Sequence, residues 1–435
     1  MASTAGIPEV EARSPRSLGE VEGFARLQAR TWNPRDDPDL RVSAYRKMWI
    51  ESGGESWRGI FDHDVNGEII CLSGCIVDQR WLRLPPAKLL AGCIGGVATH
   101  PDFRQRGLGS AVLRSAVTYG KSRGCAVLLL DGITNFYHRW GFVDVWDLTV
   151  HSIPLSAVAR LRPGSYGVRR ATVADAEALL RVYEACYGER PGSFDRTLSR
   201  QERLLGQLPP QRQVWLAMGS SGGIAGYLAL DVASPAQALE VAAESFDAAA
   251  ALLPFHAQVA VTENSGLSEV RWPLPPDDPL VAEFADAFVC AGFPYVAGEQ
   301  SQWPVVRSET VHASDGGWMA RIADPAVLMR AMLPRWQELW AAVRPAWRGV
   351  LALVVDDVAF PLALSDAGLQ LCASERIPDL AVRLTRQVFL QLLFGYRPLA
   401  WAVRQTGQEI PESARPVLAR LFASHAFWIP RSDWF

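Results

Sequence analysis

The chain has 435 residues, of which 49% are hydrophobic and 20% charged, a composition typical of a globular protein with about three domains. Lysine and arginine total 43 against 46 aspartates and glutamates, so a net charge of −3 gives no argument for nucleic acid or an anionic membrane as a partner. No apolar run reaches the roughly 20 residues that a membrane span requires. We therefore expect no membrane span and no nucleic-acid partner, and any bound anion should be held at a local site.

The seven cysteines do not have the spacing of a disulfide framework or of a metal site. Buried free thiols in a reducing compartment account for an odd number without a close pair. The first residues mix small, acidic and proline residues and show no signal sequence. We expect a cytoplasmic protein without a metal ion, in which residues 1–16 form a flexible leader.

Helices and antiparallel strands alternate in the first third of the chain. Ser17 and Glu20 form a capping box that predicts a helix over 17–32, and Pro38 suits the first turn of a second helix ending at Ser52. Asn66-Gly67 is a hairpin turn between period-two segments. The expected later elements are strands at 57–61, 68–77, 89–99 and 125–130, with Pro85-Pro86 as an interruption and a helix at 110–123.

The same order of elements begins again after a predicted linker over residues 153–164. A strand at 168–171, a helix at 172–187 and a hairpin over 213–232 indicate a duplicated α+β unit. A proline-rich break precedes a helix at 280–291. The remainder predicts a third domain with helices packed on a sheet, containing a strand at 318–322, a helix at 325–343, a meander over 350–372 and helices at 378–394 and 411–424.

The most informative segment joins the predicted strand ending at Thr99 to the predicted helix beginning at Ser110. Its glycines let backbone N–H groups approach a ligand, the helix N-terminus adds its dipole, and two arginines add charge, which together suit a pyrophosphate. It lacks the lysine of a Walker loop and the three glycines of a dinucleotide fingerprint. The segment reads Val97-Ala98-Thr99-His100-Pro101-Asp102-Phe103-Arg104-Gln105-Arg106-Gly107-Leu108-Gly109-Ser110.

Two motifs resemble those of the GNAT acetyltransferases. Arg104, Gly107 and Gly109 match the Arg/Gln-x-x-Gly-x-Gly/Ala loop of that family, and residues 135–142 resemble its Asn-x-x-Phe-Tyr region with compressed spacing. The resemblance implies a catalytic domain over 17–152 with a mixed, mostly antiparallel sheet flanked by helices, and acetyl-CoA as co-substrate. It assigns binding of acetyl-CoA to Val97, Ala98, Thr99, Arg104, Gln105, Arg106, Gly107, Leu108, Gly109, Ser110 and Asn135.

The whole chain is similar to the enhanced-intracellular-survival (Eis-like) acetyltransferases, which join tandem GNAT folds to a sterol-carrier-like domain. The repeated start at Val168, the meander and the closing Ser432-Asp433-Trp434-Phe435 carry the similarity. It implies a degenerate second GNAT domain over 165–300, whose nearest loop candidate at 203–208 lacks the last glycine. It also implies a sterol-carrier-like domain over 303–435 and a homo-oligomer such as the hexamers of that family.

The resemblance also assigns two catalytic residues. Tyr137 matches the tyrosine that protonates the departing CoA thiolate, and a phenol is a weaker acid than a thiol by about 1.5 pKa units, so protonation must accompany C–S cleavage. The α-carboxylate of Phe435 is the candidate group for the acceptor's ammonium. A carboxylate with a pKa of about 3.5 is too weak a base for direct abstraction, so it should bind the ammonium and pass its proton through water.

The expected reaction is direct acetyl transfer to a primary amine of a polyamine, an aminoglycoside-like compound or a lysine peptide. The alternative is a CoA- or lipid-binding protein with vestigial transferase activity, since sterol-carrier domains bury apolar ligands. Structural alternatives also remain open: Tyr137 could simply pack among neighbouring aromatic residues, and Phe435 could be a frayed chain end. Trp336, Trp340 and Trp347 are expected in a core or interface.

Overall fold

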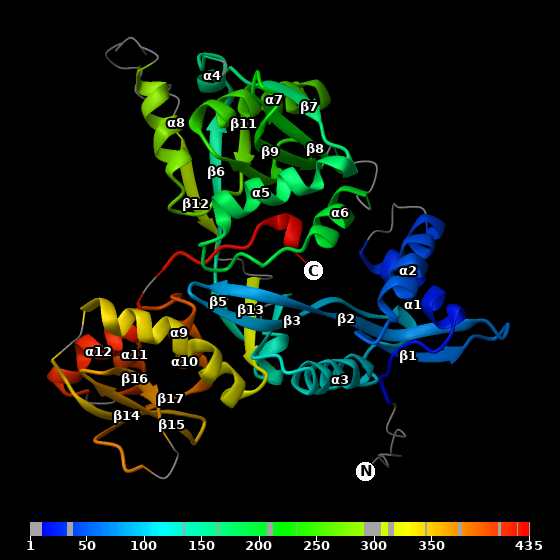
Figure 1. Cartoon of the computed structure of the whole chain (residues 1–435). Coiled ribbons are helices and arrows are strands. Elements are labelled where there is room, and N and C mark those ends of the chain that lie inside the picture. The colour runs from blue at the N-terminus through cyan, green and yellow to red at the C-terminus, as the bar shows by residue number, and fades with distance from the viewer. Residues whose placement is uncertain are drawn as a thin grey trace.

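The computed structural model of the chain contains three units, with the C-terminal tail between the first and the second (Figure 1). In Figure 1 the first unit is blue to cyan apart from the yellow strand β13, the second is green apart from the yellow strand β12, and the third is yellow to red. The structure describes residues 11–32, 38–133, 135–162, 165–206, 212–231, 233–290, 306–311, 317–343, 346–372, 376–407, 410–423 and 425–434.

The first unit is a sheet with the strand order β1-β2-β3-β4-β13-β5, in which only β3 and β4 pair in parallel. Helices α1 and α2 cover one face and α3 covers the other (Figure 1). Its elements are α1 (Leu18–Trp32), α2 (Pro38–Ser52), β1 (Trp57–His63), β2 (Ile69–Leu84), β3 (Ala87–Thr99), the 3-10 turn η1 (Pro101–Phe103), α3 (Leu108–Ser122), β4 (Val127–Gly132), the 3-10 turn η2 (Tyr137–Trp140), β5 (Val143–Trp146) and β13 (Gly317–Ile322).

The start of α1 confirms half of the predicted capping box. The Ser17 hydroxyl accepts a hydrogen bond from the Glu20 N–H at 3.2 Å. The Glu20 carboxylate, however, pairs with Arg13 at 2.6 Å. Arg13 also forms a backbone bridge with Gly59 of β1, with N–O distances of 3.0 and 2.7 Å. The described end of the expected flexible leader is therefore attached to the first sheet, and residues 1–10 lie outside the described residues.

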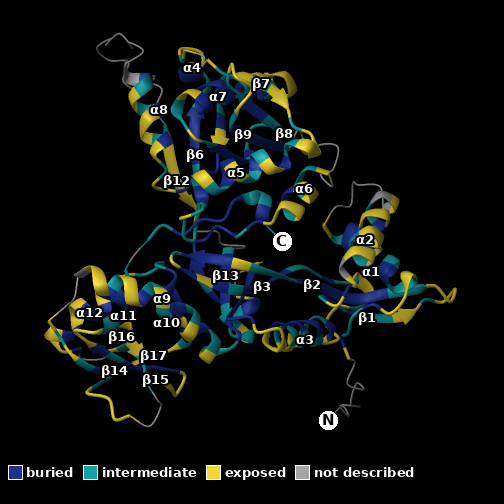
Figure 2. Cartoon of the chain, viewed as in Figure 1, coloured by how far each residue is buried: buried dark blue, intermediate teal, exposed yellow. Residues whose placement is uncertain are grey.

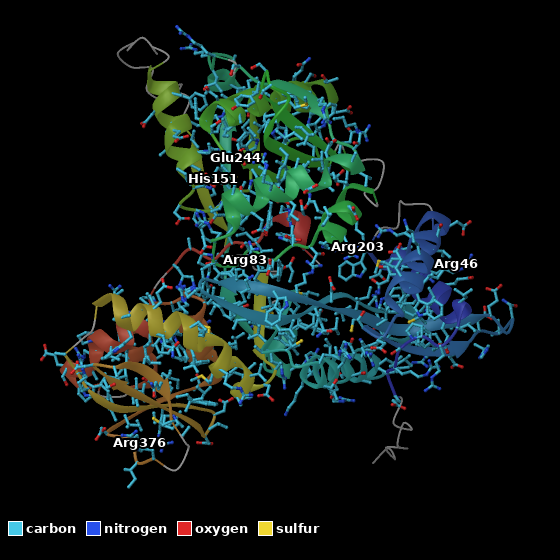
Figure 3. The ribbon with its side chains drawn as sticks, in the orientation of Figure 1. Arg46, Arg83, His151, Arg203, Glu244 and Arg376 are labelled. Atoms are coloured by element: carbon cyan, nitrogen blue, oxygen red, sulfur yellow. The ribbon has the colours of Figure 1, made fainter. Side chains whose placement is uncertain are left out.

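Strands β2 and β3 are longer than predicted because they form one continuous hairpin. The prolines at 85 and 86 do not interrupt the strands; they occupy the turn, where no ladder N–H is needed. The far end of this hairpin reaches the second unit, where Arg83 pairs with Glu184 and Asp195, each at 2.8 Å. Figure 3 shows Arg83 at this junction between the two units.

The second unit consists of the strand groups β10-β9-β8-β7 and β11-β6-β12. As in the first unit, two helices, an antiparallel meander, a helix and a further strand follow in sequence, whereas we predicted a repeat of strand, helix and antiparallel strands. Its elements are β6 (Leu148–Pro154), α4 (Leu155–Val158), β7 (Gly167–Arg170), η3 (Val173–Asp175), α5 (Ala176–Tyr187), α6 (Leu198–Gly206), β8 (Arg212–Met218), β9 (Ile224–Asp231), β10 (Ala238–Ala243), α7 (Phe246–Glu263), β11 (Glu269–Trp272), α8 (Pro279–Cys290) and β12 (Arg307–Val311).

The first two units exchange strands. β6 directly follows the first unit in sequence, yet it lies between β11 and β12 of the second. β13 follows the second unit, yet it lies between β4 and β5 of the first. The linker predicted to begin at residue 153 is therefore partly strand, and the strand predicted at 318–322 for the third domain belongs to the first sheet. Side-chain alternation predicts a strand but does not identify its partners.

The third unit has the strand order β16-β15-β14-β17, with helices packed on the sheet. The helix predicted from residue 378 is wrong in its first half: residues 380–384 form a strand parallel to β14, and Thr385 then caps a helix by accepting the Val388 N–H at 3.2 Å. The elements are α9 (Pro325–Val343), β14 (Gly349–Val355), β15 (Val358–Ser365), β16 (Gly368–Leu371), β17 (Leu380–Leu384), α10 (Arg386–Leu393), α11 (Leu399–Thr406), η5 (Glu412–Ala414) and α12 (Arg415–Leu421), before the tail turn η6 (Arg431–Asp433).

The first and third units share one hydrophobic core. Figure 2 shows buried segments in both units. Trp336 and Trp340 of α9 are fully buried there, and their indole N–H groups donate to the carbonyls of Leu421 and Ser365, both at 3.1 Å. The prediction that these two tryptophans are core residues is confirmed. Among the helices in the described ranges, none combines the length and the apolar character needed to cross a bilayer.

Because β13 lies inside the first sheet, a proline in this strand should destabilise that sheet. Ala320 pairs with Leu129 on one side and Val143 on the other, so Ala320→Pro removes a ladder hydrogen bond inside the first sheet and should destabilise it by about 1–3 kcal/mol. Hydrogen exchange followed by mass spectrometry should show lost protection in residues 127–132, while residues 349–365 stay protected. The reverse pattern would place β13 in the third unit.

Candidate functional site

The parallel strands β3 and β4 separate part of the way along their length. They pair only between residues 91–93 and 127–129, although β3 continues to Thr99 and β4 to Gly132. Beyond residue 93, the edge of β3 that faces β4 has no strand partner within the described ranges. The separation creates an opening in the middle of the first sheet, which we call the β3–β4 opening.

A bulge at Gly96 sets the direction of the β3 edge at this opening. Gly96 has a φ of 62°, and its carbonyl accepts a hydrogen bond from the buried Gln28 amide at 2.6 Å. The left-handed conformation favours glycine, and a Cβ at residue 96 would lie 2.6 Å from Gln28 Oε1, so the Gln28 amide would have to move. Sequence reasoning missed these two residues, although Gly95-Gly96 inside a strand is a recognisable sign of a bulge.

After the bulge, the backbone of β3 offers hydrogen-bonding groups to the opening. The His100 N–H donates to β2 at 2.8 Å, and the Ala98 carbonyl accepts the Ser73 hydroxyl at 2.9 Å, so both groups face β2. Because the direction of backbone groups alternates along a strand, those of Val97 and Thr99 face the opening. Ala98 itself is buried against the α1 side of the sheet.

The loop between β3 and α3 presents consecutive free backbone N–H groups. Gln105 and Gly107 have positive φ angles of 61° and 77°, and no side chain caps the N-terminus of α3. The first backbone hydrogen bond after the loop runs from the Ala111 N–H to the Gly107 carbonyl at 3.1 Å. Within the described chain, the N–H groups of residues 105–110 have no hydrogen-bond partner. Such a concave row of donors at a helix N-terminus is an anion-binding arrangement.

Side chains of the loop add positive charge and fix its ends. Arg104 and Arg106 are exposed, and their side chains contact backbone carbonyls of the loop at 3.4 and 3.1 Å. Leu108 is buried in the core beneath α3, so its side chain anchors the helix while its N–H stays in the loop. At Gly109 a Cβ would lie 3.3 Å from Thr99 Oγ1, which shows how closely the helix start approaches β3. Ser110, half-buried, completes the first turn of α3.

Tyr137 follows β4 after a turn that contains the exposed Asn135. Its ring packs over Gly132, where a Cβ would lie 2.9 Å from Cδ2, and beside Met319 in the core under α3. The hydroxyl makes no hydrogen bond with any described residue. Burial, helped by the charges of nearby Cys75 and Asp131, raises the pKa of Tyr137 to about 12. Tyr137 is therefore a neutral hydroxyl with its proton available to a ligand.

The thiols near the opening are not nucleophiles. Cys75 and Cys93 are fully buried, and burial raises the pKa of Cys75 to about 12 and that of Cys93 well above its usual range. Both stay protonated at physiological pH, which disfavours an acyl-cysteine intermediate. In the part of the chain that the structure describes, no His, Cys, Asp and Glu side chains form a group of three or more suited to a metal ion.

The C-terminal tail reaches the other face of the sheet at the same opening. The Trp434 ring meets the Trp318 ring edge-on with centroids 5.7 Å apart, and Trp318 pairs with Asp131 near the end of β4. Met319, the next residue of β13, packs with Tyr137, so alternation places Trp318 and Tyr137 on opposite faces. Phe435, the predicted partner of the acceptor's ammonium, lies outside the described residues.

A cavity of about 230 Å³ adjoins the tail. Its walls come from β5, β6, β12, β13 and the tail, and they combine aromatic rings with carboxylates. The aromatic lining residues are Trp146, Trp318, Phe427, Trp428 and Trp434, the acidic ones are Asp147 and Glu309, and the basic ones are Arg271 and Arg431.

Among its described residues, the second unit does not repeat the row of free N–H groups that residues 105–110 present before α3. The predicted loop candidate near residue 203 lies in helix α6, as Figure 3 shows for Arg203. By order of elements the match to α3 is α7, which follows β10 after only Glu244 and Ser245. Its N-terminus is capped by Ser245, whose hydroxyl accepts the Ala248 N–H at 3.3 Å, and Glu244 pairs with Arg181. Capped donors and an acidic neighbour disfavour a phosphate there.

The bulge makes a matched pair of glycine variants informative. Gly67 has a φ of 82° with nothing within 4 Å of a Cβ, so Gly67→Ala should cost only the left-handed strain of about 1–2 kcal/mol. Gly96→Ala adds the collision with Gln28 and should cost roughly 1–3 kcal/mol more. Urea unfolding midpoints measure both, and equal losses would show that the Gln28 contact does not require glycine.

Comparison with known proteins identifies the domain that contains this opening. Residues 14–143 match the family model described as acetyltransferase (GNAT) domain. A segment of 102 residues is 33% identical to an uncharacterized N-acetyltransferase from Methanocaldococcus jannaschii, and it covers 22% of this chain and 43% of that relative. The match thus spans less than half the length of that relative.

Solved structures share the fold over almost the whole chain. A GCN5-related N-acetyltransferase from Kribbella flavida has a TM-score of 0.63 at 19% identity, covering 96% of this chain and 98% of its own. A probable N-acyltransferase from Enterococcus faecalis has a TM-score of 0.69 at 15% identity (98% and 99% covered), and Eis1 from Mycobacterium abscessus has 0.58 at 18% (98% and 100%). The domain match over residues 14–143 supports an acyltransferase and confirms the GNAT resemblance of the first domain, and the solved neighbours share its fold.

Proposed function

We propose that this chain, whose residues 14–143 form a GNAT acetyltransferase domain, transfers the acetyl group of acetyl-CoA to a primary amine. The observation that carries the proposal is the meeting of three features at the β3–β4 opening. Among the described residues, these are the unpaired N–H groups of residues 105–110, the free edge of β3 after Gly96, and the buried Tyr137 hydroxyl without a hydrogen bond.

The residues at the opening suit the parts of acetyl-CoA in order. The N–H groups of 105–110, with Arg104 and Arg106, would hold the diphosphate. The backbone groups of Val97 and Thr99 would pair with the amides of the pantetheine arm as an added strand does. The thioester then comes between the β3 edge and Tyr137, where an amine can attack it directly.

Tyr137 would protonate the departing sulfur. With a pKa of about 12 against about 8.5 for a free thiol, transfer to a fully formed thiolate would be uphill by roughly 5 kcal/mol. Burial therefore makes Tyr137 an even weaker acid, relative to the thiol, than an ordinary tyrosine would be. The proton must therefore move while the C–S bond is breaking, when the sulfur has not yet become a stable anion.

The cavity beside the tail suits a cationic acceptor. The aromatic rings of its lining can attract a protonated amine through their faces, while the charges of Asp147 and Glu309 are balanced by Arg271 and Arg431 in the same lining. We propose a polyamine, an aminoglycoside-like compound or a lysine side chain as acceptor. The carboxylate of Phe435 would bind the ammonium and relay its proton through water.

The remaining architecture completes the proposal. The repeated order of elements and the capped α7 support a degenerate GNAT domain in the second unit, and the helix-on-sheet packing supports a sterol-carrier-like third domain.

We also propose a cytoplasmic homo-oligomer. Light scattering should give a mass several times 47.8 kDa, and a mass equal to one chain would contradict that part.

Replacing Tyr137 by Phe tests whether the Tyr137 hydroxyl is the general acid that protonates the departing sulfur. Tyr137→Phe should lower kcat by about 100-fold, since general acids contribute 10²–10⁴-fold. A group with a pKa of about 12 keeps its proton as pH rises to about 11, so wild-type kcat should show no falling limb below that pH. The control is Tyr119→Phe, on α3 beneath Arg58, which should keep full activity. An undiminished rate for Tyr137→Phe contradicts the assigned role.

The loop arginines test donor binding. Arg104→Gln combined with Arg106→Gln should weaken acetyl-CoA binding about tenfold in calorimetry, through loss of charge-assisted contacts to the diphosphate. Arg114→Gln, an exposed residue of α3, serves as the control. Unchanged affinity in the double variant would exclude these side chains from the site.

Thiol release from acetyl-CoA with a panel of polyamines, aminoglycosides and lysine peptides tests transfer itself. At least one acceptor should release CoA at a rate that depends on acceptor concentration. Tight acetyl-CoA binding without turnover across the panel would instead favour the binding-protein alternative.

A further inference from the structure

A buried carboxylate in the tail is held by arginines from two other units. Asp433 Oδ2 lies 2.8 and 2.7 Å from the Nε and Nη2 atoms of Arg196, in the second unit. Arg80 of β2 donates to the Asp433 carbonyl at 2.6 Å, and Arg200 of α6 lies 3.7 Å from Oδ1. The side chains of Asp433 and Arg196 are each only 1% exposed. The last described residues are therefore tied to both sheets.

Arg196 is itself held rigidly inside the second unit. Its Nη2 donates to Glu240 Oε2 at 2.9 Å, and the Tyr227 hydroxyl donates to the other Glu240 oxygen at 2.5 Å. Its guanidinium carbon lies 3.8 Å from the centre of the Tyr183 ring. The cation that holds Asp433 thus has little freedom to move, because hydrogen bonds and a stacked ring fix its plane.

The balance of charge keeps this network ionised. Burial alone would raise the pKa of Asp433, but the charges of Arg196, Arg200 and Arg80 outweigh it and lower that pKa. Buried ion pairs often stabilise a fold no more than apolar residues of the same shape would. What such a pair does supply is a fixed geometry, since a buried charge tolerates no displacement from its partner.

A second attachment precedes this one along the tail. The Trp428 N–H donates to the Pro191 carbonyl at 3.1 Å, and its indole N–H donates to the Pro273 carbonyl at 2.9 Å. The tail passes so close to Gly192 that a Cβ there would lie 2.5 Å from the Trp428 carbonyl oxygen. Two attachments on the second unit therefore define the path of the tail toward Trp318 at the opening.

We propose that Arg196, Glu240 and Asp433 form a positioning network through which the second unit holds the chain end at the catalytic opening of the first. The inference rests on the proposed function, since it is acetyl transfer that would need the chain end in place. It gives the second unit a part in the reaction although its own α7 is capped. The three residues are positioning residues and do not touch the substrate.

Digestion with carboxypeptidase tests whether the network holds the tail, independently of activity. Arg196→Gln and Asp433→Asn should each release the terminal residues at least tenfold faster than the wild type. The matched control is Arg169→Gln, which breaks an exposed 2.6 Å pair with Asp175 in the same unit and should leave the release rate unchanged. Equal rates for wild type and both network variants overturn the proposal.

Steady-state kinetics test whether holding the tail matters to catalysis. Both variants should lose at least tenfold in kcat, while KM for acetyl-CoA stays within threefold because the donor loop is untouched. Arg196→Gln combined with Asp433→Asn should be no slower than the worse single variant, since both act through one contact. An unchanged kcat in a variant with a released tail overturns the positioning role.

The Asp433→Asn variant also shows whether a loss of kcat comes from a released tail or from misfolding. It changes one atom near the chain end, and a thermal transition like that of wild type shows that the three units are intact. If the wild type transfers acetyl groups to no amine, the proposed function fails, and the release rates still decide whether the network holds the tail.

Discussion

The separation of β3 from β4 is the constraint on which the rest of the structure depends. Two parallel strands that pair over only three residues leave backbone donors and acceptors unpaired in the middle of a sheet, where each needs another partner. Gly96 and Gln28 maintain this geometry through a left-handed φ and a buried hydrogen bond. The loop over residues 105–110, the Tyr137 hydroxyl and the tail all lie around the β3–β4 opening that results.

The same opening limits the chemistry. The thiols beside it are buried and protonated, and burial also raises the pKa of Tyr137, so the pocket favours neutral groups. A neutral environment suits direct attack by an uncharged amine on a thioester. It also means that negative charge on the leaving sulfur must be neutralised as it develops, for which a hydroxyl without another hydrogen bond is well placed.

Exchange of β6 and β13 makes the first two units depend on each other. Neither sheet is complete without a strand from the other side of the exchange, and the third unit shares its core with the first sheet. The tail adds a charged link between these parts. The second unit, whose helix α7 is capped by Ser245, is thus joined to the first by exchanged strands and by the ion pair of Arg196 with Asp433.

The sequence by itself determined most local features: most of the helices, the hairpin turn at Asn66-Gly67, and the glycine and arginine loop between a strand and a helix. These depend on neighbours a few residues away, as the Ser17 cap and the consecutive N–H groups at 105–110 show. Only the tertiary structure decided which strands pair and where the tail is held. Arg196 and Asp433 are 237 residues apart in sequence. Strand β13 pairs with β4 and β5, which both lie far before it in the sequence. Nothing in a local pattern encodes such partners, because strand pairing and buried charge depend on which surfaces meet when the whole chain folds.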